Sequence, residues 1–344
     1  MKILFIGGTG VISSACSQLA IERGLELYLL NRGQTTQRPV PAGAHVLRGD
    51  IRDLSSARDA LPSHTFDAVV NFVAFTADHI ETDLELFRGR TGQYIFISSA
   101  SAYQTPPAGV PITESAPLDN PVWLYSRNKI ACEDRLMRAY REEKFPMTVV
   151  RPSHTYDKTL SPLGGGYTII DRMRKGQQVI VHGDGTSLWT MTHHKDFAKG
   201  LVGLLGNHHA IGNAFHITSD EALTWDQIYT LMAHAAGVEP TLVHIPSDLI
   251  AAYDREWGDG LLGDKAHSMI FDNSKIKRLV PGFVATIPFA QGAREIIDWF
   301  IADPARQISD SRFNQLFDRI IAAFESSLPK TLPENKTLGS SPSV

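Results

Sequence analysis

The feature that most constrains this chain is a glycine-rich turn, GGTG at 7–10, which joins a short apolar run at 2–6 to a helix-like segment at 11–23. Glycines in such a turn let the backbone approach a pyrophosphate, and the unpaired N–H groups at the start of the helix attract its negative charge. The third small position of the pattern is Ser13 instead of glycine, which still permits close packing of the helix on the strand. The order strand, turn, helix predicts a dinucleotide-binding site; the alternative is a turn whose glycines serve packing alone.

Strand-like and helix-like segments continue to alternate after this turn. Apolar runs that read as buried parallel strands occur at 26–30, 68–73, 94–98 and 147–150, and helical patterns at 57–61 and 125–144. Such alternation predicts an α/β fold in which helices cover both faces of a parallel sheet. We therefore expect a Rossmann doubly wound parallel sheet with a smaller C-terminal substrate-binding annexe.

The regular alternation ends near residue 155, and the later segments look divided between two layers. We expect an NAD(P)-binding Rossmann domain over 1–155, completed by about 190–220, and a substrate-binding annexe over 156–189 and 221–328. The tail at 329–344 is rich in Pro, Ser and Lys and is predicted to be mobile.

Composition and charge restrict the class of partner. The net charge of the 344-residue chain is -4, without the excess of Lys and Arg that neutralises nucleic-acid phosphates, so a small-molecule partner is favoured over nucleic acid. The two cysteines, Cys16 and Cys132, lie in helix-like stretches with neither disulfide nor metal-ligand spacing, and no metal is expected. Because no run resembles a signal sequence or a membrane span, we place the protein in the cytoplasm, away from membranes.

The end of the second predicted strand indicates which dinucleotide is bound. An acidic residue there usually hydrogen-bonds the ribose 2′-hydroxyl and repels a 2′-phosphate, but this chain has Asn31 and Arg32. A guanidinium matches a phosphate in charge and geometry, so NADP is favoured over NAD. The alternative for Arg32 is an exposed surface charge. Asp50 and Ile51, after a third strand-like run, are candidates for contacts with the adenine.

Tyr125 and Lys129 are four residues apart on a predicted helix, which places both side chains on one face. A neighbouring ammonium stabilises a phenolate, so we expect Lys129 to lower the pKa of Tyr125 from its usual value of about 10. The same spacing also arises in ordinary helix-surface pairs.

A serine cluster precedes this pair at the end of the strand-like run 94–98. Ligands of parallel sheets bind at the carboxyl ends of the strands, where the hydroxyl of Ser99 is expected to hold a substrate oxygen near Tyr125. The alternative is a polar strand exit that satisfies backbone groups.

Six motifs follow one another in a fixed order over roughly residues 1–300, namely GGTGVIS, GDIRD, ISSASAY, Tyr-x-x-x-Lys, RPSHTY and GDGTSLWTMTHHKDFA. With them the chain resembles the extended short-chain dehydrogenases/reductases, the NAD-dependent epimerase/dehydratase family. The resemblance implies an NAD(P)-binding Rossmann fold and redox chemistry on a sugar-like substrate. It also implies that Ser99 is the catalytic Ser/Thr, Tyr125 the general acid/base and Lys129 its assisting lysine. The expected cofactor-binding residues are Gly7, Thr9, Gly10, Val11, Ile12, Asn31, Arg32, Asp50, Ile51, Val73, Ala74 and Pro152.

Departures from the family pattern affect the expected substrate and assembly. Trp189 stands where nucleotide-sugar enzymes usually have a phosphate-binding arginine, and His154 stands at a frequent Asn position. With these features the chain resembles an atypical branch that includes the chloroplast stem-loop-binding proteins. Ser101, His154 and Trp189 are expected to line the substrate pocket, the alternative for the aromatic residues being a buried cluster between the domains. A homodimer is compatible with the family, although the short segment 74–93 predicts a truncated interface helix.

The leading hypothesis is an NAD(P)-dependent epimerase, dehydratase or reductase acting on a sugar, a nucleotide sugar or another hydroxyl or carbonyl compound. Two alternatives remain open: an RNA-binding protein of the stem-loop-binding type, and a regulator that senses the dinucleotide without catalysis.

Overall fold

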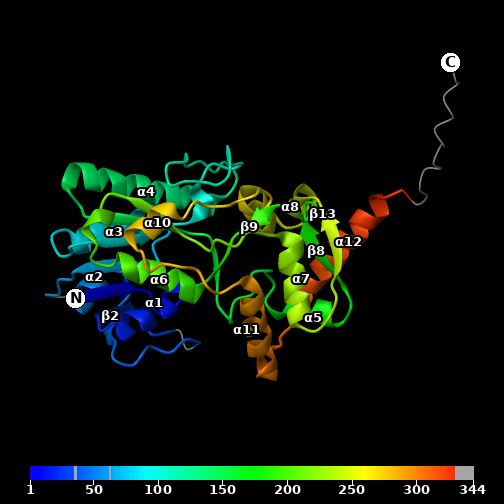
Figure 1. Ribbon diagram of the computed structural model, residues 1–344, viewed down its shortest axis with the longest axis horizontal. Helices are drawn as coiled ribbons and strands as arrows, with labels where there is room; N and C mark the ends of the chain where they lie inside the picture. Colours follow the sequence, from blue (N-terminus) through cyan, green and yellow to red (C-terminus); the bar gives the residue numbers. More distant parts are fainter. Residues whose placement is uncertain (35–36, 62, 330–344) are drawn as a thin grey trace, which may run out of the picture.

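A seven-stranded parallel sheet forms one half of the molecule, which is a computed structural model that describes residues 1–34, 37–61 and 63–329 (Figure 1). Its strands, in the order β11, β6, β5, β4, β1, β2, β3, are β1 (Lys2–Ile6), β2 (Glu26–Asn31), β3 (His45–Arg48), β4 (Ala68–Asn71), β5 (Tyr94–Ile97), β6 (Met147–Pro152) and β11 (Ala214–Ile217). Every neighbouring pair is parallel. The chain reverses its direction of winding between β1 and β4, and ligands of such sheets bind in the crevice at this point.

Helices cover both faces of the sheet, as the apolar strands predict. One face carries α1 (Val11–Glu22), α6 (His194–Leu204) and α10 (Ser274–Leu279), and the other carries α2 (Leu54–Ala60), α3 (Ala77–Phe87) and α4 (Leu124–Glu143). β1 is buried on both faces, with Ile3 and Phe5 in one core and Leu4 and Ile6 in the other. The predicted Rossmann doubly wound sheet is therefore confirmed.

Several element boundaries differ from the predicted ones for local reasons. The predicted helix at 57–61 begins earlier, at Leu54, because the Asp53 carboxylate accepts hydrogen bonds from the N–H groups of Ser55 and Ser56 and so caps the helix. The predicted strand at 68–73 ends at Asn71, whose side-chain oxygen accepts the N–H of Val73 at 2.7 Å. Turn-forming side chains, which hydrophobic periodicity does not register, set both limits.

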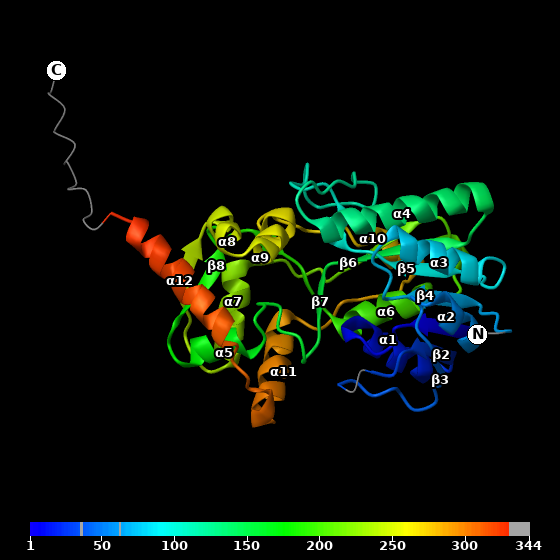
Figure 2. The ribbon, with the colours of Figure 1, turned by 180° about the vertical axis from the view of Figure 1, so that it is seen from behind.

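The annexe forms the second half, seen at the right of Figure 1 and from behind in Figure 2, with its own apolar core. Its main elements are the parallel pair β8 (Gln178–His182) and β13 (Thr241–Ile245), with α5 (Tyr167–Arg174), α7 (Trp225–Ala235), α8 (Ser247–Tyr253), α9 (Arg255–Gly260), α11 (Phe289–Ile301) and α12 (Ser311–Ser327). There are two further short pairs, β7 (His154–Tyr156) with β10 (Met191–His193) and β9 (Leu188–Trp189) with β12 (Leu223–Thr224). Tyr156, Met191 and Trp189 of these strands belong to the annexe core.

The chain returns to the sheet with β11 after it has entered the annexe. β11 pairs with β6, Ala214 lying opposite Val149, so residues 214–217 complete the sheet as expected. The exact division into two domains stays a prediction, and from residue 330 onward the predicted mobile tail lies outside the described residues. Within the described residues, no helix combines the length and the apolar character needed to cross a membrane.

A buried carboxyl group anchors α3 to the sheet. Asp83 accepts a hydrogen bond from the Asn71 amide at 2.6 Å and another from the hydroxyl of Tyr94, while its second oxygen has no partner. Burial raises the pKa of Asp83 to about 7, against the lowering effect of these two donors. Asp83 therefore keeps its proton to a higher pH in the folded protein than in the unfolded chain.

The free energy of unfolding should consequently decrease as the pH is raised from about 4 to about 7, because Asp83 loses its proton in this range. The folded protein binds this proton more tightly than the unfolded chain, so raising the pH through this window favours unfolding, by up to roughly 4 kcal/mol. Urea unfolding at several pH values should show this slope in the wild type and its loss in Asp83→Asn. Equal slopes in the two proteins would contradict the assignment.

Candidate active site

The glycine-rich turn connects β1 to α1 at the winding reversal of the sheet. Gly7 has φ +84°, and a Cβ there would lie 2.5 Å from Cγ1 of Val73, so only glycine fits between the two strand ends. Ser13 Oγ accepts the N–H of Gly10 at 2.7 Å and donates to the carbonyl of Gly7 at 2.6 Å. Ser13 therefore ties the two ends of the turn together, a role that glycine does not fill.

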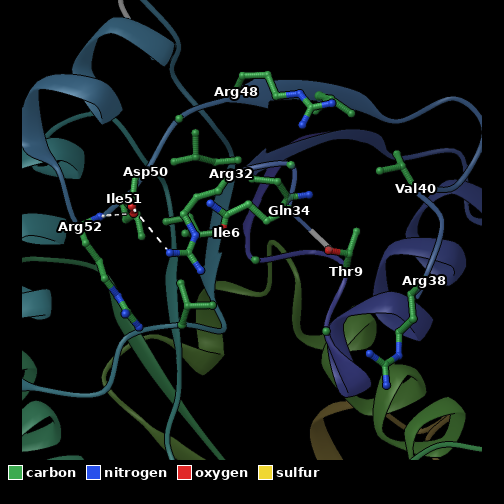
Figure 3. A pocket seen from close by; sticks show the side chains of 18 of the residues that line it. Ile6, Thr9, Arg32, Gln34, Arg38, Val40, Arg48, Asp50, Ile51 and Arg52 are labelled. Carbon is green, nitrogen blue, oxygen red and sulfur yellow. Dashed lines mark hydrogen bonds and ion pairs between the residues drawn. The ribbon is translucent and has the colours of Figure 1, made fainter. Parts of the chain in front are cut away.

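A cavity of about 490 Å³ opens beside this turn (Figure 3). Its lining includes nine of the predicted cofactor-binding residues: Gly7, Thr9, Gly10, Val11, Asn31, Arg32, Asp50, Ile51 and Val73. The glycine backbone leaves an open cradle at the start of α1, where N–H groups lack helical partners, so these residues fit the pyrophosphate of a dinucleotide. Of the other predicted cofactor residues, Ile12 and Pro152 line the neighbouring cavity, and Ala74 lines neither.

Four arginines line this cavity against one carboxylate, Asp50. Arg38 forms an ion pair with Asp157 at 2.7 Å, so its charge is already matched. Arg32 is more than half exposed and approaches Asp50 only to 3.9 Å; Figure 3 shows the two side chains directed toward each other. Arg48 lies over Gly33, where a Cβ would overlap its guanidinium. With Arg52 also in the lining, the rim of the cavity carries an excess of positive charge.

A second cavity, of about 390 Å³, lies at the carboxyl ends of β5 and β6. It brings together all six residues expected in the catalytic and substrate sites: Ser99, Ser101, Tyr125, Lys129, His154 and Trp189. Ile12 and Pro152 also line it, so it adjoins the dinucleotide cavity at the same edge of the sheet.

Three serines form a hydrogen-bonded chain at the wall of this cavity. Ser99 Oγ lies 2.9 Å from Ser101 Oγ, which accepts the hydroxyl of Ser126 at 2.8 Å. Ser99 also accepts the N–H of Ser101 at 3.2 Å and caps a short helical turn, Ala100–Ala102. Ser99 therefore satisfies a backbone N–H group, as the alternative interpretation predicts, and it also lines the cavity. The Ser99 hydroxyl also lowers the pKa of Tyr125, and both side chains line this cavity.

Lys129 is buried beneath Tyr125 with its charge directed at backbone oxygens. Its Nζ donates to the carbonyls of Ala74 and Ile97, each at 2.8 Å, and lies 5.7 Å from the centre of the Tyr125 ring. Burial lowers the pKa of Lys129 to about 8. An ammonium has three N–H donors, so one remains for a ligand in the cavity.

The expected lowering of the Tyr125 pKa is wrong for this structure. Burial raises the pKa of Tyr125 to about 12 and outweighs the lowering effect of the Ser99 hydroxyl, while the charge of Asp264 raises it further. The ammonium of Lys129 is turned toward two carbonyls, which satisfy its charge. Tyr125 is therefore a neutral phenol at neutral pH in this structure.

His154 and Trp189, which are expected to line the substrate pocket, are both uncharged. Burial, followed by the charge of Lys265, lowers the pKa of His154 to about 3. Trp189 lines the cavity and also packs against Trp225, with ring centroids 6.1 Å apart. Trp189 therefore both lines the pocket and belongs to a buried aromatic cluster.

Sequence reasoning missed several further residues of this cavity, among them Trp123, Asp264 and Lys265. Trp123 stands two positions before Tyr125, and that closeness could have pointed to it. Asp264 and Lys265 lie far along the chain on an irregular turn, and no periodic pattern marks them. Within the part of the chain that the structure describes, no cluster of His, Cys, Asp or Glu could hold a metal ion.

Comparison with known proteins agrees with this architecture. The model of the "NAD dependent epimerase/dehydratase family" matches residues 3–217. The chain is 26% identical over 257 residues to the chloroplast stem-loop binding protein of 41 kDa b from Arabidopsis thaliana, and 33% identical over 150 residues to a UDP-glucose 4-epimerase from Streptomyces lividans. These alignments cover 71% and 38% of this chain, but only 65% and 45% of the two relatives.

Solved structures share the fold at low sequence identity. An epimerase from Methanothermobacter thermautotrophicus superposes with a TM-score of 0.73 at 16% identity, covering 88% of this chain and 93% of that chain. A UDP-glucose 4-epimerase from Bifidobacterium longum, solved with NAD+ and UDP, superposes with a TM-score of 0.72 at 18% identity, covering 90% of this chain and all of the other.

Removal of the Ser13 hydroxyl should loosen the glycine-rich turn. Ser13→Ala eliminates two hydrogen bonds in a buried position and is expected to lower the free energy of unfolding by about 1–3 kcal/mol. The matched control is Ser14→Ala, because Ser14 makes only a 3.3 Å bond to the carbonyl of Val11. Urea denaturation of both variants tests this expectation, and equal losses in the two would refute the bridging role of Ser13.

Proposed function

The chain belongs to the NAD-dependent epimerase/dehydratase family, and from this premise we propose that it catalyses NAD(P)-dependent epimerisation, dehydration or reduction of a sugar-like hydroxyl or carbonyl compound. One observation carries the proposal: Ser99, Tyr125 and Lys129 line a single cavity at the sheet edge, next to the cavity at the glycine-rich turn. The relatives whose names specify UDP-glucose epimerases and dTDP-glucose dehydratases support a carbohydrate substrate.

The proposed mechanism assigns proton transfer to Tyr125. When bound, the nicotinamide ring would accept or donate a hydride at the substrate carbon. Tyr125, a neutral phenol, donates its proton to the substrate oxygen and takes one back in the reverse direction. Ser99 hydrogen-bonds the same oxygen and orients it.

Lys129 assists through hydrogen bonds under this proposal. Its third N–H donor is available to the nicotinamide ribose. Its two bonds to carbonyl oxygens fix the ammonium beneath the cavity floor. The serine chain through Ser101 and Ser126 holds Ser99 in place.

NADP is the proposed cofactor form, on the strength of the arginines around the first cavity. Arg32 and Arg48 stand at the ends of β2 and β3, where a 2′-phosphate of the adenosine ribose would lie. The single carboxylate among them, Asp50, leaves the rim positively charged.

RNA binding is the second candidate, because one relative is named a chloroplast stem-loop binding protein. The net charge of -4 argues against it, since RNA phosphates require clustered cations. The positive rim around Arg32 is local and belongs to a concave cavity, a shape that suits a small anionic group better than a helical backbone.

Substitution of Tyr125 by Phe should abolish turnover while leaving dinucleotide binding within about twofold. The loss of the proton donor is expected to reduce the rate by about 100-fold or more. Turnover can be followed by NMR analysis of products and cofactor affinity by fluorescence of the reduced nicotinamide. Unchanged turnover would refute the role of Tyr125; tight cofactor binding without turnover of any sugar in the wild type would favour the sensing regulator.

Substitution of Arg32 by Ala should weaken NADP binding by about tenfold or more and leave NAD binding nearly unchanged, because only NADP carries the 2′-phosphate. The matched control is Arg58→Ala, an equally exposed arginine paired with Glu85 on the surface. Isothermal titration with the two dinucleotides measures the ratio. If the NADP to NAD ratio does not change, Arg32 is a surface charge, as its alternative interpretation holds.

A further inference from the structure

Two adjacent residues of the annexe, Asp264 and Lys265, reach into the cavity that contains Tyr125. They end a π-helical turn, Leu261–Lys265, a rare geometry that occurs frequently at functional sites. Lys265 Nζ lies 3.2 Å from the Asp264 carboxylate and 5.2 Å from the centre of the Trp123 ring. The Asp264 side chain is only 8% exposed, so the little surface it has faces this cavity.

Asn120 holds this turn against the catalytic segment. Its buried amide donates to the carbonyls of Ser101 at 3.0 Å and Gly263 at 2.6 Å, and its oxygen accepts the N–H of Trp123 at 2.9 Å. A Cβ at Gly263 would lie 2.8 Å from Cβ of Trp123, so the two segments are in close contact. Asp264 and Lys265 are thus held at a fixed distance from Ser101 and the start of α4.

The charges that line the cavity nearly cancel. Lys129 directs two of its donors into the protein, and the ring of His154 is neutral. Lys265 is matched by Asp264, and none of the described residues that line the cavity is an arginine. A diphosphate brings two negative charges, which proteins neutralise with arginine clamps, lysines, metal ions or helix N-termini. This cavity supplies one paired lysine for that purpose.

The same groups suit hydroxyl groups. A carboxylate accepts hydrogen bonds from two neighbouring hydroxyls, and an ammonium donates to their oxygens, while Trp123 offers an apolar ring beside them. The cavity of about 390 Å³ is at the small end of the usual range of roughly 300–1,000 Å³. A bound nicotinamide ring would take part of this space, which leaves less of it for the substrate.

We propose that Asp264 and Lys265 determine substrate specificity by binding the hydroxyls of an unphosphorylated sugar, and that a nucleotide diphosphate sugar is not the substrate. This inference rests on the proposed function, because it assigns the substrate class of the same site. It separates the chain from the relatives named for UDP-glucose.

The test is calorimetric titration of the cofactor-loaded protein with D-glucose, D-galactose, D-mannose and D-xylose, and with UDP-glucose, dTDP-glucose and UDP. At least one free sugar is expected to bind, UDP is not, and the nucleotide sugars should bind no more tightly than the free sugar. Asp264→Asn and Lys265→Met should each raise the Kd of that sugar about tenfold or more, because each removes hydrogen bonds to a charged group. Lys277→Met is the matched control, since Lys277 pairs with Asp220 at the surface, outside the cavity.

Two further measurements keep the outcome unambiguous. Unchanged Kd for the dinucleotide in both variants shows that they fold, and product NMR on the wild type reports turnover independently of binding. The inference is overturned if UDP-glucose binds at least tenfold more tightly than every free sugar, if none of the compounds binds, or if both variants bind sugar like the wild type. Sugar binding that depends on Asp264 and Lys265 without any product would instead defeat the proposed activity and uphold the inference.

Discussion

The ammonium of Lys129 joins the three parts of the protein on which the site depends. From α4 it donates to the carbonyl of Ala74, after β4, and to that of Ile97, at the end of β5. A buried charge is costly unless it is hydrogen-bonded, so α4 is fixed over these two strand ends and Tyr125 is fixed with it. One turn farther along α4, Glu133 forms an ion pair with Arg151 of β6 and accepts the hydroxyl of Ser98. The polar side of α4 therefore sets the positions of the strands that carry the candidate catalytic groups.

The two cavities differ in charge, and the difference follows from their positions in the sheet. The first lies where β1, β2 and β3 end and has an excess of arginine side chains on its rim. The second lies where β5 and β6 end, is closed by the annexe and is nearly neutral. The proposed anionic cofactor and the proposed uncharged substrate would thus occupy adjoining spaces lined by groups of different character.

The strand pattern predicted the sheet well because parallel strands are buried on both faces. ILFI in β1 and the apolar run of β4 are recognisable without any tertiary information, and GGTG fixes where a dinucleotide approaches. The convergence of Ser99, Tyr125 and Lys129 was also predictable, because the helix spacing and the strand end place them at one edge of the sheet. The pKa of Tyr125 was not, because the degree of burial and the direction in which the Lys129 ammonium points depend on the packing of distant segments.

By itself, the sequence determined the parallel sheet, the glycine turn and the face of α4 that carries Tyr125 and Lys129, since these depend on local periodicity and short spacings. The tertiary structure alone placed Asp264 and Lys265 in the second cavity. Asp264 is 139 positions after Tyr125 in the numbering, and it lines the same cavity next to Gly263, whose carbonyl accepts a hydrogen bond from Asn120. Contacts between segments so far apart depend on how two separate cores pack together, and this information is absent from any local pattern of residues.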